Sequence, residues 1–161
     1  SCESSDRPKM PLRYVRSRAG EWGVRRDAVG IGGFSAGGHL SAKAATVLRR
    51  REQWKKDSVD RLAKRPDFLM LIYPGLWLPR DAVVDGTMPP AFIVNGRDDR
   101  LTTADRCIRF YQKLLKLKVK AELHVYQQGE HGFGVGSDEN ACGSWPELFV
   151  RWLKVNGVGH T

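Results

Sequence analysis

The stretch Gly33-Phe34-Ser35-Ala36-Gly37-Gly38 decides the fold, because it sets a serine between glycines where two kinds of pattern meet. An apolar run, Ala28 to Gly33, precedes Ser35, and a helical pattern begins near Ala36. This strand–turn–helix setting is typical of a nucleophile elbow, a sharp turn that raises the serine hydroxyl above a sheet. We expect a side chain at either flanking glycine to clash with the turn. The amide of Ala36, at the start of the helix, can donate to a developing oxyanion.

The composition predicts one domain with an apolar core and a basic surface. The chain has 161 residues, of which 41% are hydrophobic, and 27 basic against 18 acidic residues give a net charge of +9. The basic residues are scattered or lie in short runs, which is typical of solvated helix faces. A nucleic-acid surface would need a basic stripe interleaved with aromatic residues, and the sequence contains none. We therefore predict no nucleic-acid partner.

The cysteines and the chain ends argue against several other classes. Cys2, Cys107 and Cys142 have no C-x-x-C spacing, so we predict neither a disulfide scaffold nor a zinc site, and no metal. No apolar segment is long enough to span a membrane. Ser1 to Lys9 has no signal-peptide core, and the compartment stays open. Because the chain does not begin with Met, we expect that its gene begins further upstream.

Apolar runs after the serine predict further strands. Phe68 to Tyr73 is a continuous apolar run closed by Pro74-Gly75, which suits a strand covered on both faces. Ala91 to Asn95 has the same character, whereas Ala121 to Tyr126 alternates and suits a strand near a sheet edge. Helical periodicities separate the strands: Leu12 to Trp22, Leu40 to Leu48, Ile108 to Leu115 and Trp145 to Val155. This alternation predicts an α/β fold with a mostly parallel sheet.

The strand ends carry the partners that a serine nucleophile needs. A serine hydroxyl requires a base, usually a histidine oriented by a carboxylate, in the chain order Ser, Asp or Glu, His. Asp98 and Asp99 follow the strand that ends at Asn95, and His131 follows the last strand. Either aspartate fits the position of the acid, and either could instead cap the next helix. Alternatively, Ser35 is only a glycine-rich helix entry and His131 an ordinary loop residue.

Other polar and aromatic residues have simpler interpretations. His39 reads as a helix-start residue and His124 as a strand surface residue. Thr102 and Asp105 are spaced like a capping box at the start of a helix. Trp77 and Leu78, in the loop after the second strand, could line an acyl or sugar pocket or serve as ordinary packing.

The chain resembles the α/β-hydrolase superfamily, and within it bacterial esterases related to acetyl xylan esterases and feruloyl esterases. The resemblance runs from about Leu12 to Leu153, and its motifs are Glu21-Trp22-Gly23-Val24, Gly33-Phe34-Ser35-Ala36-Gly37-Gly38-His39-Leu40, Pro89-Pro90-Ala91-Phe92, Asp98-Asp99-Arg100-Leu101, and Ala121-Glu122-Leu123-His124-Val125-Tyr126 with Gly132-Phe133-Gly134. It implies a three-layer fold, with a mostly parallel sheet and helices on both faces. It also implies Ser35 as nucleophile, Asp99 as acid, His131 as base and the Ala36 amide as oxyanion donor.

One part of the family pattern is missing. Family members carry a His-Gly-Gly loop ahead of the nucleophile, which supplies a second oxyanion amide, and no His-Gly-Gly precedes Ser35. We therefore expect residues 1–161 to be the C-terminal part of a single α/β-hydrolase domain, truncated on its N-terminal side. Losing one oxyanion donor costs about 10²–10³ in rate in a measured case. The strand before Ser35 would also be left as an apolar edge.

The resemblance predicts a serine carboxylic-ester hydrolase that acts on short, acetyl-type esters without a cofactor. Its substrate would be a small ester or an acylated carbohydrate. Two alternatives stay open: a serine peptidase like the prolyl oligopeptidases, and a truncated hydrolase remnant without activity. The sequence does not indicate an oligomeric state.

Overall fold

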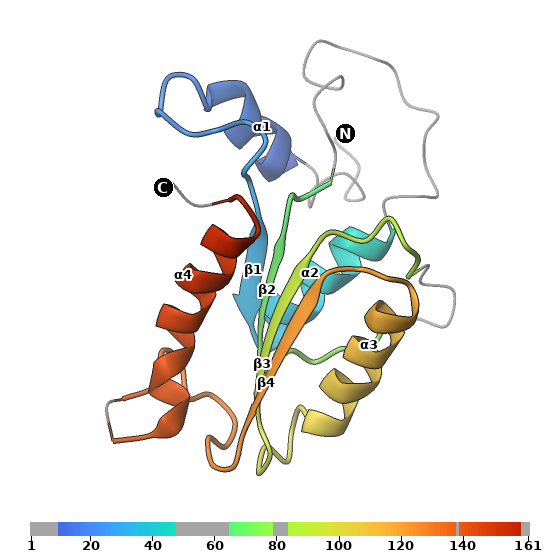
Figure 1. Ribbon diagram of the computed structural model, residues 1–161, viewed down its shortest axis with the longest axis vertical. Helices are drawn as coiled ribbons and strands as arrows, with labels where there is room; N and C mark the ends of the chain where they lie inside the picture. The colour runs from blue at the N-terminus through green and yellow to red at the C-terminus, as the bar shows by residue number, and fades with distance from the viewer. Residues whose placement is uncertain (1–9, 48–64, 79–83, 138, 159–161) are drawn as a thin grey trace, which may run out of the picture.

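The computed structural model describes residues 10–47, 65–78, 84–137 and 139–158, and Figure 1 shows their arrangement. Helices and strands alternate along these ranges. In chain order they are α1 (Met10–Arg18), β1 (Ile31–Phe34), α2 (Ala36–Val47), β2 (Leu69–Ile72), β3 (Ala91–Gly96), α3 (Ala104–Lys116), β4 (Ala121–Tyr126), a short 3-10 helix (Ala141–Ser144) and α4 (Trp145–Val155).

The four strands form one parallel sheet, in the order β1-β2-β3-β4. The predicted parallel α/β architecture is thus confirmed, and β4 lies at an edge, as its alternating pattern indicated. All four carboxyl ends face the same way, toward the bottom of Figure 1. Groups that follow different strands therefore gather at one end of the sheet.

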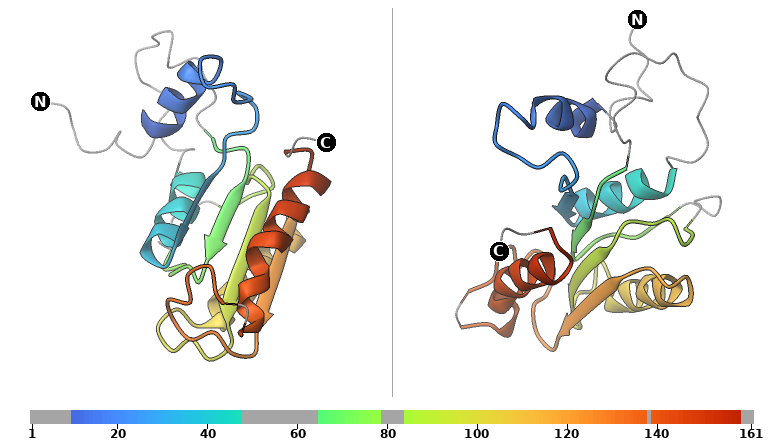
Figure 2. Two further views of the ribbon diagram at one scale, coloured as in Figure 1. Left: turned by 90° about the vertical axis from the view of Figure 1, so that its left-hand side faces the viewer. Right: turned by 45° about the horizontal axis from the view of Figure 1, so that its top comes forward.

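Helices cover both faces of the sheet, which gives the predicted three layers (Figure 2). On one face, α2 and α3 pack over Leu69 and Leu71 of β2. On the other face, α4 packs its Trp145 and Trp152 against Ile72. Because successive strand side chains point to opposite faces, a strand buried on both sides must be apolar throughout. That requirement accounts for the continuous apolar run in β2.

β1 forms the other edge of the sheet, and within the described residues its only strand partner is β2. It begins at Ile31, three residues later than the predicted Ala28. Ahead of β1, the Val29 N–H donates to the Asp67 carboxylate over 2.7 Å. A side chain thus accepts the backbone N–H that would have bonded to β2 if β1 began earlier. Phe34 stays 39% exposed, which agrees with the expected apolar edge.

The first helix ends earlier than its periodicity predicted. α1 stops at Arg18, and the chain then turns through Gly23, whose φ is +64°. Trp22 therefore does not continue the buried face; it is half exposed and contacts Tyr14 edge-on. The buried Arg16 ties α1 to the rest of the molecule through an ion pair of 2.9 Å with Asp67.

Candidate active site

Ser35 links the end of β1 directly to the start of α2. Its φ of 50° lies in the left-handed region, which is costly for a residue that has a side chain. Three backbone hydrogen bonds hold the turn. The Ser35 N–H donates to the Ile72 carbonyl over 3.0 Å, and the Ser35 carbonyl accepts the N–H groups of His39 (3.0 Å) and Gly75 (3.3 Å).

The elbow needs glycine at two positions because the backbone packs closely there. A Cβ on Gly33 would lie 2.7 Å from the carbonyl carbon of Gly37, and a Cβ on Gly38 would lie 2.9 Å from the Gly33 carbonyl oxygen and from Pro74. The clash that the sequence predicted at Gly37 is wrong, since a Cβ there meets nothing within 4 Å. The first helical turn aims Gly38, and not Gly37, at the neighbouring loop.

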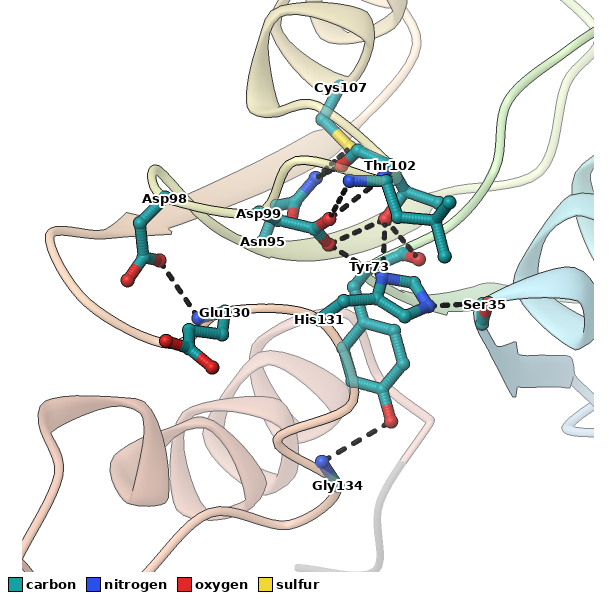
Figure 3. A network of polar contacts seen from close by, with 11 residues as sticks. Ser35, Tyr73, Asn95, Asp98, Asp99, Thr102, Cys107, Glu130, His131 and Gly134 are labelled. Atoms are coloured by element: carbon teal, nitrogen blue, oxygen red, sulfur yellow. Dashed lines mark hydrogen bonds and ion pairs between the residues drawn. The ribbon is translucent and has the colours of Figure 1, made fainter.

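The structure brings Ser35, His131 and Asp99 into one hydrogen-bonded chain (Figure 3). Ser35 Oγ lies 2.9 Å from His131 Nε2, and His131 Nδ1 lies 2.8 Å from Asp99 Oδ2. The three residues follow β1, β4 and β3, so they meet at the carboxyl edge of the sheet. A serine next to a histidine that contacts a buried carboxylate has the geometry of an activated nucleophile.

Of the two candidate aspartates, only Asp99 contacts the histidine. Asp99 is 3% exposed; its Oδ1 accepts the amides of Leu101 and Thr102 at 2.8 Å, and its Oδ2 accepts the Thr102 hydroxyl at 2.6 Å. The Asp98 carboxylate instead accepts the Glu130 amide at 2.9 Å. The side chains of Asp98 and Asp99 thus point in different directions, although the two residues are adjacent. The sequence does not show these directions.

Burial alone raises the pKa of Asp99, because a low-dielectric setting disfavours the charged form. Hydrogen bonds from the Thr102 side chain and amide, from His131 and from the Leu101 amide outweigh burial and hold the pKa below its ordinary value. Asp99 is therefore an ionised carboxylate near neutral pH. In that state it can orient the histidine and stabilise a positive charge on it.

Tyr73, which sequence reasoning missed, supports the loop that carries His131. Its ring packs edge-on against His131, with centroids 5.1 Å apart, and against Phe133 at 4.6 Å. Its hydroxyl accepts the Gly134 N–H over 3.2 Å. The signal was its position, since Tyr73 is the last apolar residue before Pro74, just beyond the carboxyl end of β2.

A second missed residue, Asn95, fixes Thr102, which in turn donates to Asp99. The buried Asn95 amide donates to the Thr102 carbonyl over 2.6 Å and contacts Cys107 Sγ at 3.3 Å. A polar residue at the end of the apolar β3 was the available signal. The predicted capping box is wrong, because the Thr102 hydroxyl bonds to Asp99 while Thr103 takes the N-cap position without a side-chain hydrogen bond.

Cys107 packs in the core on the face covered by α2 and α3. Burial raises the pKa of the Cys107 thiol to about 11, so the thiol is neutral near pH 7. A neutral buried thiol is a poor nucleophile.

The other predicted site residues are Ala36, Trp77 and Leu78, and their surroundings differ. Ala36 is the first residue of α2, so its amide stands directly beside Ser35. Trp77 is 48% exposed, with the Arg106 guanidinium 4.8 Å from its ring centroid. It borders a hollow of about 430 Å³ that also includes Lys113. Leu78 is half-buried against the core under α2 and α3.

The residues on the histidine loop border a second, polar cleft of about 590 Å³, which includes Asp98, Glu130 and His131. Across the described ranges, no three or more His, Cys, Asp or Glu side chains are grouped so that they could hold a metal ion. In those same ranges, no helix has the length and apolar character needed to cross a membrane.

Comparisons with known proteins agree with this fold. The family described as alpha/beta hydrolase fold matches residues 10–86. An acetylxylan esterase of Xylanibacter ruminicola is 29% identical, over 89% of this chain and 34% of its own length. The crystal structure of an acetyl ester-xyloside bifunctional hydrolase from Caldicellulosiruptor lactoaceticus superposes with a TM-score of 0.84 at 28% identity, covering 94% of this chain and 65% of that one. A carboxylesterase from Lactobacillus plantarum superposes at 0.80 with 20% identity, covering 96% and 68%.

The sheet topology, the serine elbow and these matches define an α/β hydrolase. The chain has the α/β-hydrolase fold, and it is similar to an acetylxylan esterase, an acetyl ester-xyloside hydrolase and a carboxylesterase. It spans about a third of the length of the acetylxylan esterase and 65% of the bifunctional hydrolase.

Proposed function

We propose that this chain carries the nucleophile, base and acid of a serine carboxylic-ester hydrolase. The observation that supports this most directly is the contact series from Ser35 Oγ through both nitrogens of His131 to Asp99 Oδ2, at 2.9 and 2.8 Å. The esterase names of its relatives support the same reaction class.

In the proposed reaction, Ser35 Oγ attacks the ester carbonyl carbon while His131 Nε2 accepts the hydroxyl proton. The tetrahedral oxyanion receives a hydrogen bond from the Ala36 amide. As the ester C–O bond breaks, Nε2 gives its proton to the leaving alcohol, and an acyl-enzyme remains on Ser35. A water molecule then attacks the acyl carbon and gives a proton to His131 Nε2; as the bond between the acyl carbon and Ser35 Oγ breaks, Nε2 passes that proton to Oγ and the carboxylic acid leaves. Asp99 keeps its charge throughout and stabilises the imidazolium.

The proposed substrates are short acyl esters, with an acetylated carbohydrate as the physiological class. The words acetylxylan and xyloside in the names of two relatives support this class. Trp77 supports it as well, since a half-exposed indole beside a hollow gives a sugar ring an apolar platform. Trp77→Ala should then raise KM for an acetylated xylo-oligosaccharide and leave KM for a small aryl acetate unchanged. We propose that Leu78 does not contact the substrate and only packs against the core next to Trp77.

The test measures hydrolysis of 4-nitrophenyl acetate by the purified chain, together with the mass of the protein after treatment with a fluorophosphonate. Wild type should show turnover and an adduct on Ser35, and Ser35→Ala should show neither. Ser17→Ala, in which a half-buried serine of α1 is changed, is the matched control. Equal hydrolysis by wild type and Ser35→Ala would refute the assignment. An adduct without turnover would point instead to the silent remnant, because one oxyanion amide alone would not support the rate.

A further inference from the structure

The Thr102 side chain contacts both members of the Asp99–His131 pair. Its hydroxyl oxygen lies 2.6 Å from Asp99 Oδ2, 3.1 Å from His131 Nδ1 and 3.0 Å from the carbonyl oxygen of Tyr73 (Figure 3). Thr102 is 1% exposed, so water does not compete for these contacts. The hydroxyl thus sits where three different loops meet.

A hydroxyl has one proton to donate and lone pairs to accept with. Asp99 Oδ2 and the Tyr73 carbonyl are both acceptors, so Thr102 can donate to only one of them at a time. While His131 is neutral, the carboxylate is the stronger acceptor and also the nearer one. In that state Asp99 Oδ2 is shared between the Thr102 hydroxyl and the His131 Nδ1–H.

The balance changes when His131 becomes positively charged. The imidazolium Nδ1–H then forms a stronger hydrogen bond to Asp99 Oδ2 than the Thr102 hydroxyl does. A hydroxyl that still donates to the same oxygen weakens that hydrogen bond. A rotation about the Thr102 Cβ–Oγ bond moves the hydroxyl proton to the Tyr73 carbonyl, which lies within reach at 3.0 Å. The same rotation leaves a lone pair of Thr102 Oγ1 facing Nδ1–H at 3.1 Å.

We propose that Thr102 is a positioning residue whose hydroxyl proton alternates between Asp99 and the Tyr73 carbonyl as His131 loses and gains its proton. This proposal rests on the proposed role of His131 as the base for Ser35. No covalent bond forms or breaks during the rotation. Its effect is to strengthen the hold on His131 only in the charged state, which is the state that forms during the reaction.

The surroundings keep the three contacts in place. The Asn95 amide holds the Thr102 carbonyl at 2.6 Å, and the Thr102 N–H is fixed on Asp99. Among the described residues, Asp99 is the ionisable group within ion-pair distance of His131. Asp98 and Glu130 border the same cleft from the loop side, and Tyr73 packs its ring against His131 from β2.

The alternation and a fixed arrangement predict opposite pH effects. If the hydroxyl always donated to Asp99, its removal would strengthen the Asp99–His131 contact and move the acid limb of kcat/KM to higher pH. If the proton alternates, and the Oγ1 lone pair stabilises the imidazolium Nδ1–H by more than the hydroxyl stabilises the neutral pair through Asp99, removal of the hydroxyl moves the acid limb to lower pH. The direction of the change therefore distinguishes the two arrangements.

The experiment compares Thr102→Val, which keeps the shape, with Thr102→Ser, which keeps the hydroxyl. We expect Thr102→Val to lower kcat by about three- to tenfold, the worth of one neutral hydrogen bond. KM for 4-nitrophenyl acetate should not change, and the acid limb should move to lower pH. Thr102→Ser should restore both kcat and the limb. Thr46→Val is the matched control, because Thr46 is a buried threonine of α2 whose hydroxyl donates to the Lys43 carbonyl.

A second measurement does not need turnover. The titration of the His131 imidazole, followed by NMR in the resting protein, should move to lower pH in Thr102→Val and not in Thr102→Ser. Thr102→Ala is the second variant without a hydroxyl if the valine protein does not fold. A shift to higher pH, or the same loss in Thr102→Ser as in Thr102→Val, would overturn the proposal. Wild type without Ser35-dependent hydrolysis would refute the esterase instead, while the NMR titration would still test Thr102.

Discussion

Replacing Asp99 by asparagine tests the proposed acid most directly, because the change keeps the shape and removes the charge. Asp99 Oδ1 accepts two backbone amides, from Leu101 and Thr102, each at 2.8 Å. The asparagine carbonyl oxygen must take this position, since an NH₂ group there would face two donors. The NH₂ group then faces His131 Nδ1 at the 2.8 Å that Oδ2 now occupies.

That placement fixes the wrong tautomer of His131. An NH₂ donor requires Nδ1 to be an acceptor, so the imidazole proton moves to Nε2, which lies 2.9 Å from Ser35 Oγ. A protonated Nε2 cannot accept the serine proton. In a serine protease with this geometry the same substitution lowers kcat about 10⁴-fold, and we expect a loss of about 10³–10⁴ here.

The assay is kcat/KM for 4-nitrophenyl acetate, with thermal melts to show that each variant is folded. Asp98→Asn is the control: the Asp98 carboxylate accepts the Glu130 amide, and an asparagine oxygen can accept it as well. We expect that variant to stay within about threefold of wild type. The reasoning is wrong if Asp99→Asn keeps more than a tenth of the wild-type activity, or if Asp98→Asn loses as much as Asp99→Asn.

Three further predictions follow from contacts around the site. Tyr73→Phe removes the acceptor for the Gly134 amide and should cost about 0.5–1.5 kcal/mol of stability, with a few-fold loss of kcat; an unchanged melting temperature and rate would contradict this. Gly33→Ala places a Cβ 2.7 Å from the Gly37 backbone and should cost about 1–3 kcal/mol in urea unfolding, whereas Gly37→Ala meets no atom and should not; similar losses in both would contradict the close approach. Because the folded-state pKa of Asp99 is lowered, its stabilisation is complete above the ordinary carboxyl pKa of about 4 and is lost as the pH falls through the lower folded value. Urea unfolding from pH 6 to pH 2.5 should show a part of the acid destabilisation that is missing in Asp99→Asn, and identical pH dependence in both proteins would contradict this.

The fold was readable from the sequence because burial on two faces leaves a simple pattern. β2 and β3 have to be apolar at every position, since alternate side chains enter the two cores on opposite faces of the sheet. The predicted end of the first helix at Trp22 was wrong, because a helical period can continue by chance beyond the residue where the backbone turns. Periodicity reports which residues are apolar and does not report where a helix ends.

The site was readable in outline only. Chain order alone predicts that an acid follows β3 and a base follows β4. The choice between Asp98 and Asp99, however, depends on the direction in which each side chain leaves the same turn. Thr102 was misread because its spacing to Asp105 fits a local capping pattern. The Thr102 hydroxyl can donate to Asp99 or to the Tyr73 carbonyl, and Tyr73 is 29 residues away in the chain. Local spacing cannot predict a partner that the fold supplies.

The backbone just beyond the carboxyl ends of the strands adopts unusual conformations, and these help to position the residues of the candidate site. Ser35, Tyr73 and Glu130 have φ values of 50°, 35° and 45°, and each lies just beyond a strand end. Such conformations cost of order 1–3 kcal/mol each and persist only where the surroundings fix them. Here the surroundings do so: the turn at Ser35 is held from β2, the ring and hydroxyl of Tyr73 are packed on the histidine loop, and Asp98 holds the Glu130 amide. The three strained turns thus support one another around Ser35 and His131. We therefore expect a substitution that relaxes any one of these turns to change the Ser35–His131 distance before it unfolds the sheet.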